Sequence, residues 1–390
     1  MENFSKYLCI FGGGAVRGYA YLGILRAFEE TGFYPEKVAG SSVGAIFAAF
    51  YALDMPLIEM GKVFMDVNFE LFKDINISFA PTFSISKGKV FLEWLRKNIE
   101  KTYYKENYKK GENEPVRFRD LKRDLIILTT DLATCTTVVF SKETTPDYEV
   151  AQAIRISTAM PGLMPPVEYE GKLLADGDIL KGKPMWFLHD ALCPSDLRIL
   201  DLRLEGVKQT PKVKSLLDYA NTVYSCMTNA PTDYIYKKYH ACDKFDIIKI
   251  DTKDLILVDF NISDETKNAL AYMGYAIAMK FFKEDLPAKR KALLETYSAL
   301  DEKVSVVQKS LNDIKKVKIA FGDLFCALIE SRKQIEKRIF KKIKNFKNLY
   351  ENNISKGFLG REKIENKRVL KKEILEIKEI LDKKCIELSK

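Results

Sequence analysis

The feature that most constrains the fold is a short turn of small residues between two apolar segments. Residues 38–44 spell Val-Ala-Gly-Ser-Ser-Val-Gly, and the apolar stretch 45–50 follows directly. Only Gly40, Ser42 and Gly44 fit the pattern Gly-x-Ser-x-Gly, which is typical of a nucleophilic serine on a strained strand-to-helix turn. The helix N-terminus beside such a serine favours developing negative charge. Buried turns without any chemistry also produce this pattern, so the turn alone leaves both interpretations open.

A second turn of small residues lies closer to the N-terminus. The apolar segment 7–11 has the form of a buried parallel strand, and Gly12-Gly13-Gly14-Ala15 joins it to a segment with helical apolar spacing. This loop lacks the Gly-Lys-Ser/Thr of a phosphate loop and the glycine spacing of a dinucleotide site. What remains is a row of backbone N–H groups before a helix, which binds an anion. In an acyl-transfer enzyme that anion is the tetrahedral oxyanion.

A candidate base follows a further short strand, where Asp176-Gly177 begins a turn. Functional groups in α/β sheets gather at such strand ends. Histidine is the usual partner of a serine nucleophile, but the chain has only two, His189 and His240, and neither lies in a recognisable motif. A carboxylate acts as a base when it is partly desolvated and hydrogen-bonded to the hydroxyl. We therefore expect Asp176 to be the base for Ser42.

Strands interleaved with helices indicate an α/β domain over 1–286. Within it, an insertion at 54–120 carries amphipathic segments on both sides of a Phe-rich turn at 79–83. We expect its helices to cover a face of the sheet, and a lid that meets lipid is the alternative. Apolar segments predict further strands at 125–131, 137–140, 197–204 and 245–251, and helical periodicity predicts helices at 150–156, 213–227 and 265–282.

From residue 287 onward glycine and proline almost vanish, and apolar residues recur at steps of three and four. This periodicity predicts an all-α helical hairpin or short coiled coil at 287–390. The extension holds 27 Lys+Arg against 15 Asp+Glu, a net charge of +12, whereas the rest of the chain carries −3. A solvated helix face, attachment to an anionic membrane and self-association are the interpretations left open, and no motif indicates nucleic-acid binding. The basic residues concentrate at Lys341, Lys342, Lys344 and Lys347.

Composition narrows the remaining classes. The chain has 390 residues, 47% of them hydrophobic, which is typical of one or two globular domains. Its seven cysteines are scattered without a Cys-x-x-Cys pair, so we expect a reducing compartment, no disulfide framework, and neither a metal nor a cofactor. No uncharged apolar run reaches 18 residues, and 1–6 lacks the features of a signal peptide. We expect a cytoplasmic protein that associates with membranes only peripherally.

Four sequence blocks occur in one order over 7–184: the glycine-rich loop with Arg17-Gly18, the Gly40–Gly44 turn, the strand around 122–132, and 154–167 leading to Asp176-Gly177. This combination resembles the patatin-like phospholipase family. The resemblance implies a three-layer α/β/α fold with a mostly parallel central sheet. It also implies a catalytic dyad with Ser42 as nucleophile, Asp176 as base and no third catalytic residue. The implied oxyanion loop comprises Gly12, Gly13, Gly14 and Ala15, with Arg17, Gly40, Gly44 and Gly177 as supporting residues.

The sequence departs from the family pattern at three positions. Ala15 stands where the family has the last loop glycine, Gly182 where it often has asparagine, and Asp178 where it often has glycine or alanine. We expect the Asp178 carboxylate either to raise the pKa of Asp176 or to point into solvent. The leading hypothesis is a lipid acyl hydrolase of phospholipase A or lysophospholipase type, whose substrate is a phospholipid or another acyl-ester lipid. Acyl transfer by the same dyad, or a decayed core retained as a membrane- or protein-binding module, are the alternatives.

Overall fold

A computed structural model describes residues 7–67, 75–78, 84–180, 197–206, 219, 222–223, 226–227, 242–252, 262–356 and 362–389. The chain divides into two compact units. The α/β unit comprises 3–237 and 246–282, and the helical unit comprises 1–2, 238–245 and 283–390. The expected boundary lay at 286–287. In the structure the C-terminal helices begin their unit at residue 283, and the internal segment 238–245 belongs with them.

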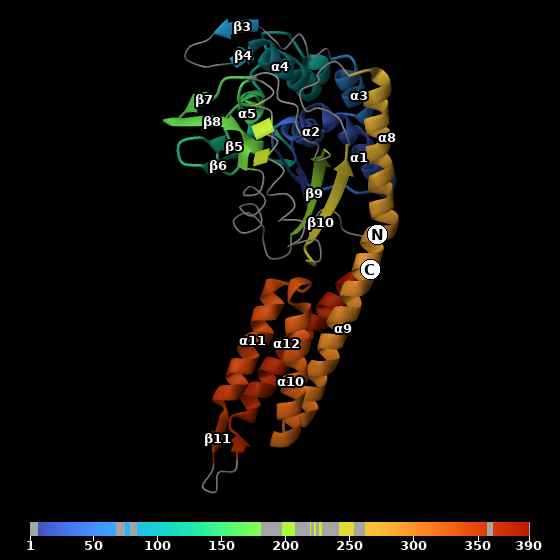
Figure 1. Ribbon diagram of the computed structural model, residues 1–390, viewed down its shortest axis with the longest axis vertical. Helices are drawn as coiled ribbons and strands as arrows, with labels where there is room; N and C mark the ends of the chain where they lie inside the picture. Colours follow the sequence, from blue (N-terminus) through green and yellow to red (C-terminus); the bar gives the residue numbers. More distant parts are fainter. Residues whose placement is uncertain are drawn as a thin grey trace. The chain divides into compact units, whose positions relative to one another are not determined.

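The α/β unit is built on an eight-stranded sheet with the strand order β10-β9-β1-β2-β5-β8-β7, in which β6 also pairs with β5 (Figure 1). The neighbouring strands β9, β1, β2 and β5 run parallel, whereas β6 and β8 run antiparallel to β5 and β7 runs antiparallel to β8. The strands are β1 (Tyr7–Phe11), β2 (Lys37–Gly40), β5 (Asp124–Asp131), β6 (Thr136–Ser141), β7 (Val167–Tyr169), β8 (Lys172–Asp176), β9 (Arg198–Glu205) and β10 (Phe245–Asp251).

The register of the strands brings three distant turns to one edge of the sheet. Phe11 at the end of β1 lies opposite Gly40 at the end of β2, so the glycine-rich loop and the serine turn leave the sheet side by side. On the other side of β2, Thr129 of β5 lies opposite Asp176 of β8. The parallel strands β1, β2 and β5 have their carboxyl ends at the same edge, which is where sites in α/β folds form. The antiparallel strand β8 brings Asp176 to this edge through its pairing with Thr129, near the carboxyl end of β5.

The helices of the α/β unit pack on this sheet and on each other, and α2 is buried on all sides. The insertion contributes α3 and α4, which pack against the core: Phe64 of α3 stacks on Phe47 of α2 with ring centroids 4.1 Å apart. Arg96 of α4 makes two hydrogen bonds, of 2.6 and 2.8 Å, to the carboxylate of Glu149 just before α5. These are the contacts of covering helices, and the Phe-rich turn at 79–83 lies outside the described residues. The described elements are α1 (Ala20–Thr31), α2 (Val43–Ala52), α3 (Leu57–Met65), β3 (Ile75–Ser78), β4 (Ser84–Ser86), α4 (Lys89–Tyr104), α5 (Val150–Ser157) and α8 (Asp264–Lys280).

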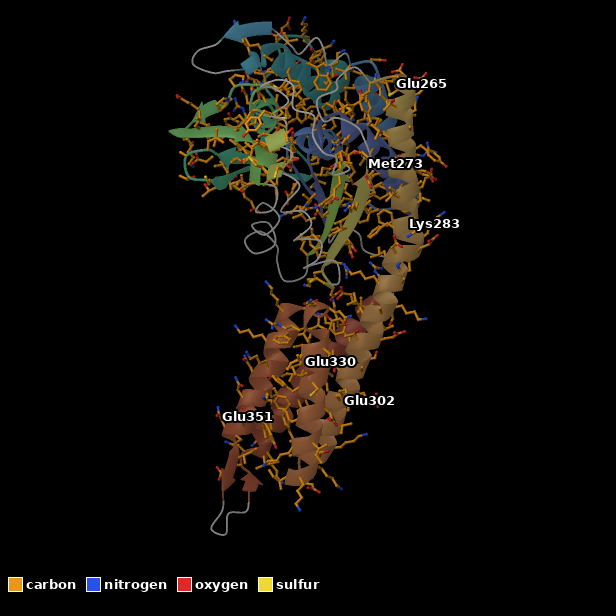
Figure 2. The ribbon with its side chains drawn as sticks, in the orientation of Figure 1. Glu265, Met273, Lys283, Glu302, Glu330 and Glu351 are labelled. Atoms are coloured by element: carbon orange, nitrogen blue, oxygen red, sulfur yellow. The ribbon has the colours of Figure 1, made fainter. Side chains whose placement is uncertain are left out.

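The helical unit contains four long helices among its described residues, and the predicted fold class is confirmed. Its periodic apolar positions form one core, in which Val304, Leu324, Ile343 and Leu381 are buried. The expected helical hairpin is divided further because Asp313 caps a new helix, accepting hydrogen bonds from the N–H groups of its first turn. In Figure 2, Glu302, Glu330 and Glu351 mark exposed positions on or at the ends of three different helices. The elements are α9 (Leu286–Ser310), α10 (Ile314–Glu330), α11 (Lys337–Asn352), the hairpin β11 (Ile354–Lys356) and β12 (Glu362–Ile364), and α12 (Lys367–Leu388).

Within the described part of the chain, no helix combines the length and the apolar character that crossing a bilayer requires. The same residues contain no cluster of three or more His, Cys, Asp or Glu side chains arranged to hold a metal ion. Six cysteines lie within the described residues and form no disulfide: Cys9, Cys135, Cys226, Cys242, Cys326 and Cys385.

Candidate active site

Ser42 lies on a strained turn between β2 and α2. Its backbone has φ 51° and ψ −131°, a conformation that costs an L-residue about 1–3 kcal/mol. The neighbouring glycines permit close backbone approach: a Cβ on Gly40 would lie 2.4 Å from the Gly44 carbonyl oxygen, and a Cβ on Gly44 would lie 2.1 Å from that of Phe11. Local strain of this kind is stored at functional sites and is held by the surrounding structure. The turn therefore has the geometry that the Gly-x-Ser-x-Gly pattern predicts.

The side chains of Ser42 and Asp176 meet although they are 134 residues apart. The Ser42 hydroxyl donates a hydrogen bond of 2.8 Å to Oδ2 of Asp176. The second carboxylate oxygen, Oδ1, accepts a 2.8 Å hydrogen bond from the backbone N–H of Asp178. Asp176 is 0% exposed, so its carboxylate is held in one orientation and shielded from bulk water. A nucleophile in contact with an oriented base is the minimal arrangement for acyl transfer.

The last residue of α5 and the segment that follows it hold the backbone of both residues. The N–H of Ser42 lies 3.1 Å from Oγ of Ser157 and 3.2 Å from its carbonyl oxygen. The Ser157 hydroxyl in turn donates to the carbonyl of Leu128 in β5 at 2.7 Å. Two residues further on, the carbonyl of Ala159 accepts a hydrogen bond from the N–H of Asp176 at 3.1 Å. The sequence places this segment before the aspartate but does not reveal that it fixes the backbone of both residues.

The glycine-rich loop is fixed at its first residue. The N–H of Gly12 donates to the carbonyl of Leu202 in β9 at 3.1 Å, and the carbonyl of Gly12 accepts a hydrogen bond from the Tyr21 hydroxyl. Burial raises the pKa of Tyr21, and the negative charges of Asp178 and Asp201 raise it further, so the phenol stays a donor. The prediction that the Gly12 amide contributes to an oxyanion hole is wrong, because that N–H already donates a hydrogen bond to the carbonyl of Leu202 in the sheet.

The remaining loop residues lie beside Ser42. A Cβ on Gly13 would lie 2.8 Å from Cβ of Ser42, so only glycine fits there. Gly14 precedes a short 3-10 helix, Ala15–Tyr19, and Ala15 has φ 48°. This left-handed conformation explains why a glycine suits the position, since a side chain there costs about 1–2 kcal/mol.

Asp178 points inward, so the alternative that its carboxylate points into solvent is wrong. It is 2% exposed. Its Oδ1 atom accepts a hydrogen bond from the Ser41 hydroxyl at 2.5 Å and another from the N–H of Gly13 at 3.2 Å. The turn thus holds two serine–aspartate pairs, Ser42 with Asp176 and Ser41 with Asp178. The spacing of the serines at i, i+1 and of the aspartates at i, i+2 was the available signal for the second pair.

The supporting residues occupy separate positions around these pairs. Gly177 is tightly packed, since a Cβ there would lie 2.1 Å from the carbonyl oxygen of Leu128. Arg17 is buried with its guanidinium against Gly206, and burial lowers its pKa while Asp251 opposes the shift. His189, His240 and Gly182 lie outside the described residues.

The fold and this site define an α/β protein with a serine–carboxylate pair at the carboxyl edge of a mostly parallel sheet. Residues 9–187 match the family model described as patatin-like phospholipase. The match supports lipid hydrolysis as the broad class of activity.

Relatives extend the comparison unevenly along the chain. The uncharacterised protein YqhO of Bacillus subtilis is 24% identical over 300 residues, which cover 70% of this chain and 97% of YqhO. The lysophospholipase nte1 of Aspergillus fumigatus is 27% identical over 175 residues, covering 43% of this chain but 10% of that protein. The crystal structure of VipD from Legionella pneumophila aligns with a TM-score of 0.50 at 17% identity, covering 98% of this chain and 90% of VipD. The last similarity concerns the fold alone.

Proposed function

We propose that this protein is a lipid acyl hydrolase of phospholipase A or lysophospholipase type, acting through a Ser42–Asp176 dyad. The observation that carries the proposal is the 2.8 Å hydrogen bond from the Ser42 hydroxyl to the buried Asp176 carboxylate on a strained turn. The lysophospholipase relative supports an acyl-ester lipid as the substrate.

The first half-reaction forms an acyl-enzyme. Oγ of Ser42 attacks the ester carbonyl carbon while its proton passes to Oδ2 of Asp176. The carbonyl oxygen becomes an oxyanion, which amides of Gly13, Gly14 and Ala15 and the N-terminus of α2 stabilise. When the intermediate collapses, the C–O bond to the alcohol breaks, and Asp176 gives the proton to the departing alkoxide oxygen.

The second half-reaction returns the serine. Asp176 accepts a proton from a water molecule, whose oxygen attacks the acyl carbon, and the proton then passes to Oγ of Ser42 as the fatty acid leaves. The Asp178 amide holds Oδ1 of Asp176 and thereby keeps Oδ2 directed at the nucleophile. An alcohol in place of water would give acyl transfer by the same steps.

The test is the loss of activity in Ser42→Ala and Asp176→Asn variants. We expect each to reduce hydrolysis of a lysophospholipid and of p-nitrophenyl butyrate by about 10⁴-fold or more. Nucleophile and base act as one unit, so the loss of either removes most of the rate that the two give together. Asp131→Asn is the matched control: Asp131 is also buried at this end of the sheet, but it accepts hydrogen bonds from Ala133 and Thr134 in its own turn. Wild-type activity in Ser42→Ala would contradict the proposal. Products formed with and without added glycerol separate hydrolysis from transfer.

We further propose that α11 directs the helical unit to an anionic membrane surface. The predicted cluster of four lysines is divided in two. Lys342 makes ion pairs with Glu373 and Glu376, of 2.9 and 2.6 Å, so its charge is satisfied within the unit. Lys347 lies 3.5 Å from Glu351 and 4.0 Å from the centre of the Phe325 ring.

The other half of the cluster faces outward. Lys341 and Lys344 are exposed, and their spacing of three places them on the same side of α11. Exposed basic side chains near an anionic surface contribute about 1 kcal/mol each to binding. The membrane-facing charge therefore belongs to this outward pair.

A further inference from the structure

The carboxylate of Asp178 occupies a position that the proposed reaction needs. Its Oδ1 atom accepts the N–H of Gly13, one of the amides assigned to the oxyanion, and also accepts the hydroxyl of Ser41. The point that a Cβ on Gly13 would occupy is 2.1 Å from Oδ2 of Asp178 and 2.8 Å from Cβ of Ser42. Asp178 therefore lies next to the nucleophile and is bound to a donor that the transition state requires.

The amide of Gly13 is not free to turn away from this position. It belongs to the same planar peptide as the carbonyl of Gly12, and in a trans peptide the C=O and N–H point in opposite directions. The Tyr21 hydroxyl holds that carbonyl, and the N–H of Gly12 is fixed to Leu202. Because both sides of Gly12 are tied down, the Gly13 N–H is aimed at the space beside Ser42, and only its partner can change.

We infer that Asp178 is a built-in occupant of the oxyanion site, which must release the Gly13 amide before that amide can stabilise the tetrahedral intermediate. The inference rests on the proposed function, in which Ser42 is the nucleophile. One N–H cannot serve the Asp178 carboxylate and the substrate oxyanion at full strength. The two anions would also repel each other, and the burial of Asp178 strengthens that repulsion. The carboxylate thus lowers the activity of the chain in the state described.

The Ser41 hydroxyl strengthens this hold. Its hydrogen bond to Asp178 is short and buried, and it gives the carboxylate a second donor on the same oxygen. A carboxylate that accepts two hydrogen bonds on one atom is held more firmly than one with a single partner. Removing the Ser41 hydroxyl should therefore loosen Asp178 without altering the charge of the site.

The experiment compares Asp178→Ala, Asp178→Asn and Ser41→Ala with wild type, in the full chain. The alanine variant frees the Gly13 amide and removes the charge. We expect its kcat/KM for p-nitrophenyl butyrate to rise about 10- to 100-fold, because one oxyanion donor is worth about 10²–10³ in rate. The asparagine variant keeps an oxygen that can accept from Gly13, so its increase should be smaller. Ser41→Ala should give the smallest increase.

Binding of an alkyl boronic acid separates this role from a structural one. The boronate forms a tetrahedral anion on a serine and so mimics the oxyanion. If Asp178 competes for the site, the affinity of Asp178→Ala for the boronate should rise by a factor similar to that of kcat/KM. A merely structural carboxylate predicts unchanged or weaker boronate binding together with a lower Tm. Asp131→Ala is the control, since it removes a buried carboxylate at the same end of the sheet and should not raise either quantity.

The outcomes distinguish this inference from the proposed function. Activity that depends on Ser42 but does not rise in Asp178→Ala or Asp178→Asn would overturn the inference and leave the hydrolase intact. If Asp178→Ala fails to fold, the near-isosteric asparagine variant decides the question. If Ser42 reacts with a fluorophosphonate probe in neither the wild type nor the Asp178 variants, both the inference and the hydrolase fail, and a decayed catalytic core is the better description.

Discussion

The two compact units bury carboxylates in contrasting ways. In the α/β unit, Asp176 and Asp178 accept hydrogen bonds from serine hydroxyls and backbone amides. In the helical unit, Lys384 places its ammonium 2.9 Å from Asp243 and 2.8 Å from Glu336. A hydroxyl partner can give up its proton to the carboxylate, whereas a lysine partner holds the negative charge in place. The first arrangement is suited to proton transfer and the second to fixing a structure.

The helical unit uses its buried charges to join three parts of the chain. Lys384 lies near the end of α12, Glu336 just before α11, and Asp243 in the short segment at 238–245. The Tyr297 hydroxyl of α9 donates to Asp243 at 3.0 Å and accepts the N–H of Glu336 at the same distance. Burial raises the pKa of Tyr297, with the charge of Asp243 adding to the shift, so the phenol remains a donor. This cluster is a structural centre of the unit.

The largest expected effect is a loss of stability in the helical unit when the buried lysine is removed. Lys384→Met should lower the free energy of unfolding of the helical unit by about 3–5 kcal/mol, because the buried Asp243 loses the Lys384 ammonium and, among the described residues, Glu336 keeps only Lys244, at 3.4 Å. Lys384 is 4% exposed. Chemical denaturation followed by circular dichroism measures the loss. Lys383→Met is the matched control, since Lys383 is exposed on the same helix and its loss should change stability by no more than about 0.5 kcal/mol. Equal effects of the two variants would show that the cluster contributes nothing.

The pH dependence of the same cluster has a defined sign. Burial lowers the pKa of Lys384, but the attraction of Asp243 and Glu336 outweighs it, so the pKa lies above the ordinary value of 10.5. A group whose pKa is raised on folding stabilises fully below its unfolded value and loses that contribution as the pH passes its folded value. We therefore expect the difference between wild type and Lys384→Met to be constant from pH 6 to 9 and to shrink in stronger alkali.

The sequence predicted the helical unit through its apolar periodicity, which requires no knowledge of the partner helix. It did not reveal that Lys384 is buried, because lysine is normally a surface residue. A signal was present all the same. Ile377, Leu381, Lys384 and Leu388 follow one another at steps of four, three and four, so the lysine occupies a core position of the helix. A charged residue in a core position predicts a buried partner of opposite charge, but not which residue supplies it.

Prediction of the α/β site had a different limit. Ser42 and Asp176 could be proposed from the sequence because each lies in a local motif of consecutive residues. Ser42 lies in a turn of small residues, and Asp176 lies at an Asp-Gly strand end. The direction of the Asp178 side chain depends on Ser41 and Gly13, which lie 137 and 165 positions away. The spacing of the serines and aspartates offers a second pair, but it does not show that the Asp178 side chain turns toward Ser41 and Gly13. For the same reason the Gly12 amide was assigned to the oxyanion hole, although its N–H donates a hydrogen bond to Leu202 in β9.

The next largest expected effect is on membrane binding, and it comes from the exposed lysines of α11. The double variant Lys341→Gln and Lys344→Gln should weaken binding to vesicles of phosphatidylcholine with phosphatidylserine by about 2 kcal/mol, roughly 30-fold, at low salt. Vesicle co-sedimentation measures this binding. The control is Lys371→Gln with Lys372→Gln, which removes two exposed charges from α12 instead. Equal weakening by both doubles would indicate diffuse attraction, and no weakening by the first would exclude α11 as the binding face.

The smallest expected effect tests the uncharged hydrogen bonds that position Ser42 in the α/β unit. Ser157→Ala removes the hydroxyl that links the N–H of Ser42 to the carbonyl of Leu128. We expect a loss of about 1 kcal/mol in stability and about a tenfold fall in kcat with KM unchanged, since the nucleophile is less firmly placed but the substrate still binds.

The adjacent Thr158 provides the control for this effect. Its hydroxyl donates to the carbonyls of Ile154 and Arg155 at the end of α5 and is likewise buried. Thr158→Ala should therefore cost a similar amount of stability without lowering kcat, as measured by thermal unfolding and steady-state kinetics on the same preparations. If both variants reduce kcat equally, the end of α5 acts through general packing, and the neutral network around Ser42 has no special role in placing the nucleophile. A fall in kcat confined to Ser157→Ala would show that hydroxyl and amide partners position this site as specifically as the lysine positions the carboxylates of the helical unit.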